Sequence, residues 1–320
     1  MSYLHDASPQ ALDRLAVLIP AWQPEAQLLT LATGLLDHGF GNVIVVNDGS
    51  TEETARELAR YGNRLRVFTQ VNQGIGCARN RGMSEARGRY IAFLDHDDVW
   101  HPEKLETQVT FMRAHPDCVG SSVPFAYTSS PDKVNFDLSI RDSEGIVRDA
   151  LHVFAGGVIF LLTSALMIDR LKVGDLRYAT RRECIEDLPL QLGLLMRGPV
   201  GVAGDRILVT YRVHASNASK SARIYENGIL LLREISRDGG FEPTSERDRR
   251  SLEEFIAFYG RISAVRLLQA GLRRRSLQCY IREFSHQVRA RRVKFLLLFP
   301  LLGMMPRFIL RLRWSGDTVP

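Results

Sequence analysis

The stretch YIAFLDHDDVW, Tyr90–Trp100, decides how this sequence folds, because an uninterrupted apolar run ends abruptly in a group of acidic residues. Asp95, Asp97 and Asp98 fall within four positions. Carboxylates so close together raise one another's pKa unless a cation lies among them. Their hard oxygen atoms favour Mg²⁺ or Mn²⁺ over softer metals.

Two interpretations fit this stretch. In the first, the acids form a solvated turn in which Asp98 caps the helix expected after Pro102. In the second, the apolar run is a buried strand, and the acids lie at its carboxyl end, where open α/β sheets bind ligands. Only the second accounts for Asp95, Asp97 and Asp98 together, so the stretch favours a metal–nucleotide site. Within that site we still expect Asp98 to be the helix-cap residue.

Composition places the chain among ordinary globular proteins. Its 320 residues are 45% apolar and 24% charged, enough for one large domain with an extension or for two domains. The four cysteines contain no CxxC pair, so neither a zinc site nor a disulfide framework is indicated, and a reducing, cytoplasmic setting is expected. The first residues lack the basic start and apolar core of a signal peptide.

Short apolar runs alternate with amphipathic stretches along most of the sequence. The runs predict buried strands at 16–20, 43–46, 66–68, 90–94 and 207–211. The amphipathic stretches predict helices at 25–38, 50–61, 74–87, 103–115 and 186–196. Alternating strands and helices indicate βαβ units and a mostly parallel sheet covered on both faces. Residues 118–180 give a mixed pattern, and the chain reads as helical from about Arg223.

Three further motifs each have a structural and a functional interpretation. Asp48, in an Asn-Asp-Gly-Ser turn, is either a turn residue or an acid placed to bind a base or ribose. Arg79 occupies the position where a strict GxGxxG motif needs glycine, so the dinucleotide-binding interpretation is weak, although a helix N-terminus beside arginine suits a phosphate. Glu186 and Asp187 are either helix-capping acids or include a general base. A lone histidine such as His214 is more often structural than a ligand.

Taken in order, these pieces resemble the inverting glycosyltransferases of family 2, which have the GT-A fold. The motifs that carry the resemblance are Val17–Trp22, Val45–Ser50, Asn72–Gly74, Ala78–Gly82, Tyr90–Asp98, Pro102–Leu105, Glu186–Asp187 and Tyr211–His214. The resemblance is close over the first hundred residues, thins over 118–180 and recovers to about 221. It implies a Rossmann-like GT-A domain with a mostly parallel sheet over 1–222, followed by a helical, basic C-terminal extension over 223–320.

The resemblance also implies a reaction: sugar transfer, with inversion, from a nucleotide-sugar to a hydroxyl of a glycan or lipid-linked acceptor in cell-surface polysaccharide synthesis. A UDP-sugar donor and Mn²⁺ or Mg²⁺ are expected. The residues placed at the donor are Pro20, Ala21 and Trp22 beside the nucleobase, Asp48 on the base, Arg79 near the base or diphosphate, and Asp95 and His96 toward the ribose. Asp97 and His214 would hold the metal, with His214 in a loop closing over the diphosphate, and Asp187 would be the catalytic base.

Two other functions were weighed against this one. Departures from the family pattern over Lys172–Tyr178 and at Leu188 and Pro189 would suit a nucleotide-sugar-binding scaffold protein with a degenerate acceptor site. A nucleotidyltransferase would need a basic, glycine-rich loop after the first strand, which Ala21–Pro24 does not provide.

The C-terminal part carries the positive charge of the chain. The net charge is +6, and residues 261–320 alone hold 13 Lys and Arg against 2 Asp and Glu. The uncharged run Phe295–Met305 is 11 residues long, too short to span a bilayer. Basic flanks over 289–314 favour an element lying on an anionic membrane surface, which places the protein at the inner face of the cell membrane. A buried helix or a homodimer contact is the alternative, and the segment has no nucleic-acid-binding motif.

Overall fold

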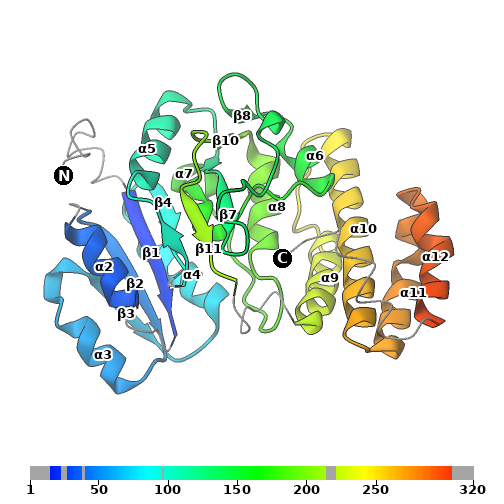
Figure 1. Ribbon diagram of the computed structural model, residues 1–320, viewed down its shortest axis with the longest axis horizontal. Coiled ribbons are helices and arrows are strands. Elements are labelled where there is room, and N and C mark those ends of the chain that lie inside the picture. The colour runs from blue at the N-terminus through cyan, green and yellow to red at the C-terminus, as the bar shows by residue number, and fades with distance from the viewer. Residues whose placement is uncertain (1–14, 23–26, 38–39, 96, 214–220, 305–320) are drawn as a thin grey trace. The chain divides into compact units, whose positions relative to one another are not determined.

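An eight-stranded, mostly parallel sheet is the framework of the N-terminal part of the chain (Figure 1). The computed structural model describes residues 15–22, 27–37, 40–95, 97–213 and 221–304. The strand order is β3-β2-β1-β4-β9-β6-β10-β8, and β9 and β8 run antiparallel to their neighbours. The strands are β1 (Leu15–Ala21), β2 (Val43–Asp48), β3 (Arg66–Gln70), β4 (Tyr90–Phe93), β6 (Gly120–Ser122), β8 (Ile146–Val147), β9 (Met167–Asp169) and β10 (Val200–Val202). The predicted α/β fold with a mostly parallel sheet is confirmed.

The register of the first strands brings their carboxyl ends to one edge of the sheet. Ala21 of β1 pairs with Asn47 of β2, and Asp48 of β2 pairs with Gln70 of β3. β1, β2 and β4 are buried along their whole length, which explains their continuous apolar runs. The loops that follow these strands therefore lie next to one another.

Helices cover this sheet and begin close to their predicted positions. They are α2 (Gln27–Asp37), α3 (Glu52–Ala59), α4 (Ile75–Glu85), α5 (Lys104–Ala114), α7 (Arg170–Val173) and α8 (Leu188–Arg197), with short 3-10 helices at η1 (Gly62–Arg64), η2 (Leu138–Ile140) and η3 (Thr163–Ala165). The region 118–180 resisted prediction because its strands span only two or three residues each, too few to show a period.

A small second sheet corrects the expectation for Asp98. β5 (Val99–Trp100) pairs with β11 (Val209–Tyr211), which also pairs with β7 (Phe125–Tyr127). A strand therefore follows Asp98, and α5 begins after Glu103 without a side-chain cap. Asp98 is buried, and its Oδ1 accepts a hydrogen bond from the backbone N–H of Arg212 at 3.1 Å. The prediction that Asp98 caps a helix is wrong.

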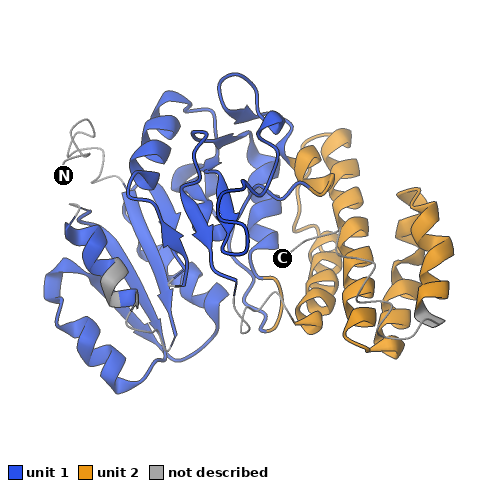
Figure 2. Ribbon diagram, in the orientation of Figure 1, with its two compact units in different colours: residues 1–150, 158–182, 186–213 blue, residues 151–157, 183–185, 214–320 orange. Residues whose placement is uncertain are grey.

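The chain divides into two compact units (Figure 2). The first contains residues 1–150, 158–182 and 186–213, and the second contains 151–157, 183–185 and 214–320. The division falls between Val213 and His214, against the predicted domain boundary at 222/223. That boundary remains a prediction.

Helices make up the second unit. They are α9 (Ala222–Arg237), α10 (Glu246–Gln269), α11 (Arg273–Arg289) and α12 (Val293–Met304), together with most of α6 (Ala150–Ala155). Phe154 of α6 stacks on Phe255 of α10 with ring centroids 5.1 Å apart. Among the described helices, none combines the length and the apolar character needed to cross a bilayer.

Candidate active site

Four residues predicted to bind the donor line one pocket at the carboxyl edge of the main sheet. The pocket has a volume of about 360 Å³, and Pro20, Ala21, Trp22 and Asp48 contribute to it. Asn72, Gly74, Ile75, Ala78 and Arg182 complete its lining. The Trp22 and Ile75 side chains are exposed, at 55% and 42%, so the pocket presents apolar surface to solvent. A cavity with a tryptophan in its lining suits a planar ring.

Asp48 organises the floor of this pocket. Its Oδ1 accepts hydrogen bonds from Gln70 Nε2 at 2.8 Å and from the backbone N–H of Gln73 at 2.9 Å, and its Oδ2 accepts one from the backbone N–H of Gly74 at 2.8 Å. A carboxylate oxygen has two lone-pair positions, so Oδ2 retains capacity for one further donor. Gly49, next in the chain, has φ +79°, and a Cβ there would lie 2.7 Å from the backbone nitrogen of Asn72, which explains the glycine.

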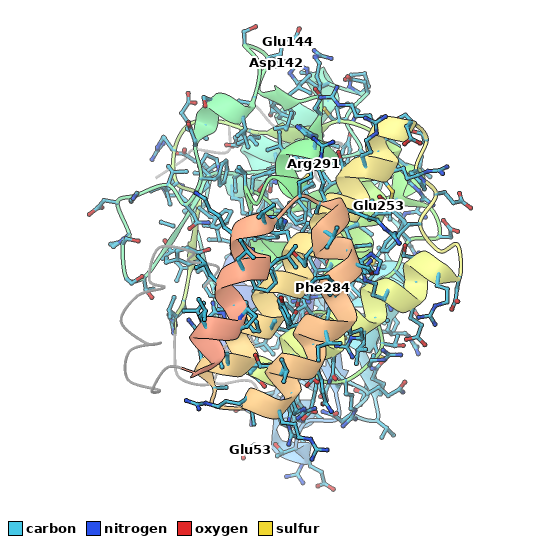
Figure 3. All side chains as sticks on the ribbon, turned by 90° about the vertical axis from the view of Figure 1, so that its right-hand side faces the viewer. Glu53, Asp142, Glu144, Glu253, Phe284 and Arg291 are labelled. Atoms are coloured by element: carbon cyan, nitrogen blue, oxygen red, sulfur yellow. The ribbon has the colours of Figure 1, made fainter. Side chains whose placement is uncertain are left out.

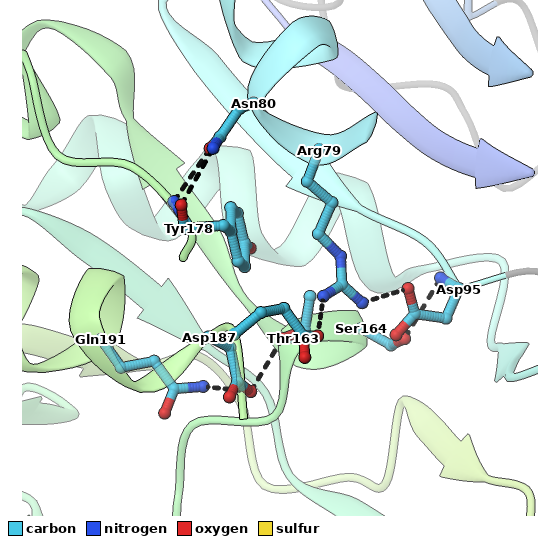
Figure 4. A network of polar contacts seen from close by, with 9 residues as sticks. Arg79, Asn80, Asp95, Thr163, Ser164, Tyr178, Asp187 and Gln191 are labelled. Atoms are coloured by element: carbon cyan, nitrogen blue, oxygen red, sulfur yellow. Dashed lines mark hydrogen bonds and ion pairs between the residues drawn. The ribbon is translucent and has the colours of Figure 1, made fainter. Parts of the chain in front are cut away.

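Arg79 connects two acidic segments that are far apart in the sequence (Figure 4). Its Nη2 donates to Asp95 Oδ1 at 2.6 Å, and its Nη1 donates to Glu186 Oε1 at 2.6 Å. The Arg79 side chain is only 3% exposed, and its guanidinium lies over the Tyr178 ring, 5.1 Å from the centroid. Burial lowers the pKa of Arg79, but Asp95 and Glu186 raise it by more, so the guanidinium stays charged.

The segment containing Tyr178 and Glu186 is held against the first turns of α4. Asn80 Nδ2 donates to the Tyr178 carbonyl and Asn80 Oδ1 accepts from the Tyr178 N–H, both at 2.9 Å. A Cβ on Gly76 would lie 2.0 Å from the carbonyl oxygen of Ala179, so the two backbones touch where only glycine fits. The contacts fix the position of Glu186 relative to Arg79.

Asp187 lies at the start of α8, beside this ion-pair network. Its Oδ2 accepts hydrogen bonds from Thr163 Oγ1 at 3.3 Å and from Gln191 Nε2 at 3.0 Å (Figure 4). Burial and then the charge of Glu186 raise the pKa of Asp187 to about 7, while Arg79 acts in the opposite direction. A carboxylate with a pKa near neutrality is suited to remove a proton from a hydroxyl group.

The acidic residues after β4 form a tight turn. The Asp98 N–H donates to the Asp95 carbonyl at 3.1 Å, and the Asp95 N–H donates to Ser164 Oγ at 3.3 Å. Burial, followed by the charge of Asp95, raises the pKa of Asp98 to about 8. Asp97 is partly buried in the same turn. His96 and His214, predicted at the ribose and the metal, lie outside the described residues.

The donor atoms of this turn fit a hard divalent cation that is only partly held by protein. Within the described ranges, no three metal-ligating side chains come together. Mg²⁺ is commonly bound by one or two carboxylates, with substrate phosphates and water completing its shell. The Asp97 carboxylate is chemically suited to be one of these protein ligands, whereas Asp95 is paired with Arg79 and Asp98 is buried.

Sequence reasoning missed several residues that shape the site. Glu186 was recognised as part of a motif but not as the ion-pair partner of Arg79, because a pairing across 107 residues leaves no local signal. Thr163 and Ser164 come from the stretch that showed no clear pattern. Tyr178 and Arg182 precede the acidic pair, and Arg182 donates to the Asn72 carbonyl at 2.5 Å and to Asn72 Oδ1 at 2.9 Å, closing one side of the pocket.

Known proteins share both the sequence and the architecture. The family profile "Glycosyl transferase family 2" matches residues 16–161. The chain is 30% identical over 234 residues to TuaG of Bacillus subtilis, named "Putative teichuronic acid biosynthesis glycosyltransferase", covering 70% of this chain and 88% of TuaG. It is 35% identical over 103 residues to the glycosyltransferase YibD of Escherichia coli, covering 31% of this chain and 30% of YibD.

Solved structures of S. aureus TarS have the same fold. TarS 1-349 in complex with UDP-GlcNAc superposes with a TM-score of 0.69 at 19% identity, covering 90% of this chain and 86% of that one. The complex with UDP gives 0.67 at 20% identity over the same shares. At this level of identity the likeness concerns the fold alone.

Fold and sequence together define the class of protein. A mostly parallel sheet with acidic loops at its carboxyl edge, followed by helices, is a GT-A glycosyltransferase architecture, and the chain is a glycosyltransferase. It belongs to glycosyltransferase family 2, which confirms the family inferred from its motifs.

Proposed function

We propose that this glycosyltransferase transfers a sugar, with inversion, from a UDP-sugar to a hydroxyl of a glycan or lipid-linked acceptor in cell-surface polysaccharide synthesis, and that it requires Mn²⁺ or Mg²⁺. The observation that carries the proposal is the raised pKa of Asp187, within a polar network that reaches Asp95 through Glu186 and Arg79. The proposed base directly follows Glu186, which Arg79 joins to the donor-side acid Asp95. The name of TuaG and the nucleotides bound to TarS support the substrate class.

The chemistry assigns separate tasks to the two acidic segments. Asp187 accepts the proton of the acceptor hydroxyl as that oxygen attacks the anomeric carbon, and attack opposite the leaving group inverts the configuration. Thr163 and Gln191 hold its carboxylate in place. A divalent cation held by Asp97 would neutralise the charge that develops on the departing diphosphate. Asp48 and Trp22 would hold the nucleobase in the pocket described above.

The direct test is product formation from defined donors. The full-length protein is incubated with UDP-sugars and, in parallel, with GDP- and dTDP-sugars, in the presence of Mn²⁺, and nucleoside diphosphate release and thermal stabilisation are measured. The proposal expects UDP-sugars to be preferred in both measurements. Preference for another nucleotide would refute the assignment of UDP as the donor nucleotide, but it would not affect the assignment of the protein as a glycosyltransferase.

Removing the aromatic side of the pocket is expected to weaken donor binding. Stacking of a base on an aromatic side chain contributes roughly 1–3 kcal/mol, so Trp22→Ala should raise the Kd for UDP by about 5- to 150-fold. Titration calorimetry with UDP measures this directly, and Leu171→Ala, an exposed apolar residue of α7, is the control. An unchanged Kd would place the base elsewhere.

Asp97→Ala tests the proposed metal role. Loss of a metal-holding carboxylate is expected to reduce transfer at saturating donor by about 100-fold or more and to remove the additional stabilisation that Mn²⁺ gives in the presence of UDP. Asp117→Ala, in the loop before β6, is the control because it is exposed and remote from the turn after β4. Mn²⁺-dependent transfer at the normal rate by Asp97→Ala would show that other groups hold the cation.

A further inference from the structure

Helix α11 of the second unit buries polar side chains and leaves apolar ones exposed. On its buried side, Ser276 Oγ donates to the Ala264 carbonyl at 2.7 Å, Gln287 Nε2 donates to the Ala257 carbonyl at 2.6 Å, and Glu283 is 1% exposed and pairs with Arg233 at 2.6 Å. Cys279 and Tyr280 are buried on the same side. The other apolar side chains of α11 remain exposed, and among them the Phe284 ring contacts Tyr280 with centroids 5.9 Å apart.

These exposed residues form one stripe. Leu277, Ile281, Phe284 and Val288 follow the spacing i, i+4, i+7, i+11, which places them on one side of a helix. They are 46–62% exposed. Figure 3 looks onto α11 and α12 and shows Phe284 on the near side. Such a stripe exceeds the scattered single apolar residues that ordinary surfaces carry.

Helix α12 packs against α11 and adds exposed apolar residues of its own. Tyr280 of α11 stacks on Phe299 of α12 with centroids 4.9 Å apart and contacts Phe295 at 5.7 Å, so the two helices are packed together. With these aromatic residues turned inward, Leu297 and Leu301 remain 68% and 56% exposed. We call Leu277, Ile281, Phe284, Val288, Leu297 and Leu301 the apolar face.

Positive charge lies beside the apolar face. Arg274, Arg282 and Arg289 occupy the neighbouring sector of α11, as follows from its 3.6-residue turn. From Arg273 to Met304 there are 8 Lys and Arg, and Glu283, the single acidic residue, is neutralised by Arg233. The two helices that carry the apolar face are therefore strongly basic, although Glu253 and Glu254 of α10 line one pocket with Arg289.

We propose that the apolar face binds an anionic lipid bilayer, with α11 and α12 lying in the interface and the arginines contacting lipid phosphates. Apolar burial and attraction to anionic headgroups both favour this arrangement. A second copy of the chain fits less well, because a symmetric contact would bring one basic face against another. The surface identified by the fold overlaps the segment 289–314 suggested by the sequence through α12, but most of its residues lie on α11, before that segment.

The test measures binding of the full-length protein to vesicles. Wild type is expected to sediment with vesicles of phosphatidylglycerol and phosphatidylethanolamine and at least tenfold less with vesicles of phosphatidylcholine. Ile281→Asn with Phe284→Asn should lower the partition coefficient at least tenfold. Arg274→Gln, Arg282→Gln and Arg289→Gln should each lower it by about fivefold, the effect of one basic residue near an anionic surface.

Control variants keep the proposal falsifiable. Leu171→Asn removes an equally exposed apolar residue from the first unit and should bind vesicles like wild type. Thermal unfolding of each variant checks that it folds. Equal binding to both kinds of vesicle, or unchanged binding by the Ile281/Phe284 variant, would overturn the proposal. The proposal would also be overturned if wild type did not bind vesicles but formed a dimer in sedimentation velocity, and if the Ile281/Phe284 variant were monomeric. The apolar face would then bind a second copy of the chain.

Discussion

Asp187→Asn is expected to lower kcat for sugar transfer by about 10²–10⁴-fold, the usual contribution of a general base. Asparagine keeps the shape of the side chain and can still contact Thr163 and Gln191 but cannot accept the proton. Donor affinity should stay within about twofold of wild type, because the lost interaction is made in the transition state. Steady-state kinetics combined with UDP titration separates the two effects. Normal transfer by this variant would show that the base lies elsewhere.

The pH dependence gives a second readout of the same group. The pKa of Asp187 is raised to about 7, so lowering the pH through 7 protonates the base. We expect kcat/KM to fall tenfold per pH unit below about 7. Glu186→Gln removes the like charge that raises this pKa, so the acid limb of the profile should move to lower pH. An acid limb that stays in place in Glu186→Gln would contradict the assignment to Asp187.

Measuring the free energy of unfolding of Asp187→Asn shows whether a loss of activity comes from the missing base or from an unfolded protein. The pKa of Asp187 is about 7 in the folded protein and has its ordinary value of 3.8 in the unfolded chain, so the folded protein binds this proton more tightly. The free energy of unfolding therefore decreases as the pH rises from about 4 to 7. Asparagine does not carry this penalty. Asp187→Asn should therefore be at least as stable as wild type at pH 8, measured by urea unfolding, so an inactive variant is not an unfolded one.

The positions of the residues proposed to bind the donor could be predicted because these residues directly follow strands. Pro20, Asp48 and Asp95 each come at or just after the end of a continuous apolar run, and parallel strands carry such residues to one edge of the sheet. The sequence therefore predicts both which residue types are present and that they lie near one edge of the sheet. Glycines at 49 and 74, both with positive φ, mark the turns between these elements.

The rest of the site depends on long-range packing. Asp98 looks like a helix cap in the sequence, but pairing of Val99 and Trp100 with β11 turns it inward. Thr163 meets Asp187 only because η3 and α8 fold together. Which residues of α11 are buried and which are exposed likewise cannot be predicted without knowing which face α10 covers. Short strands and tertiary contacts of this kind leave no local period to read.

Arg79→Met is expected to lower the free energy of unfolding by about 3–5 kcal/mol, the cost of leaving buried carboxylates without their cation. Asp95 and Glu186 are each about one-fifth exposed and would lose bonds of 2.6 Å. Arg79→Lys keeps the charge but cannot bond both carboxylates in the planar geometry of a guanidinium, so it should fold and still lose most transfer activity. Urea unfolding and steady-state kinetics on both variants measure these effects.

A matched control lies on the same helix. Arg81 pairs with Glu85 at 3.1 Å, but its side chain is 47% exposed, so Arg81→Met should cost less than about 1 kcal/mol. If Arg79 had only a structural role, the Arg79 variants would be less stable than wild type. The molecules that do fold would then show the same dependence of kcat/KM on pH as wild type. Arg79 also lowers the pKa of Asp187, so Arg79→Met, which removes the charge, should move the acid limb of kcat/KM to higher pH. If Arg79→Lys transfers sugar at the normal rate and the acid limb of Arg79→Met does not move, Arg79 does not position the acidic residues for catalysis.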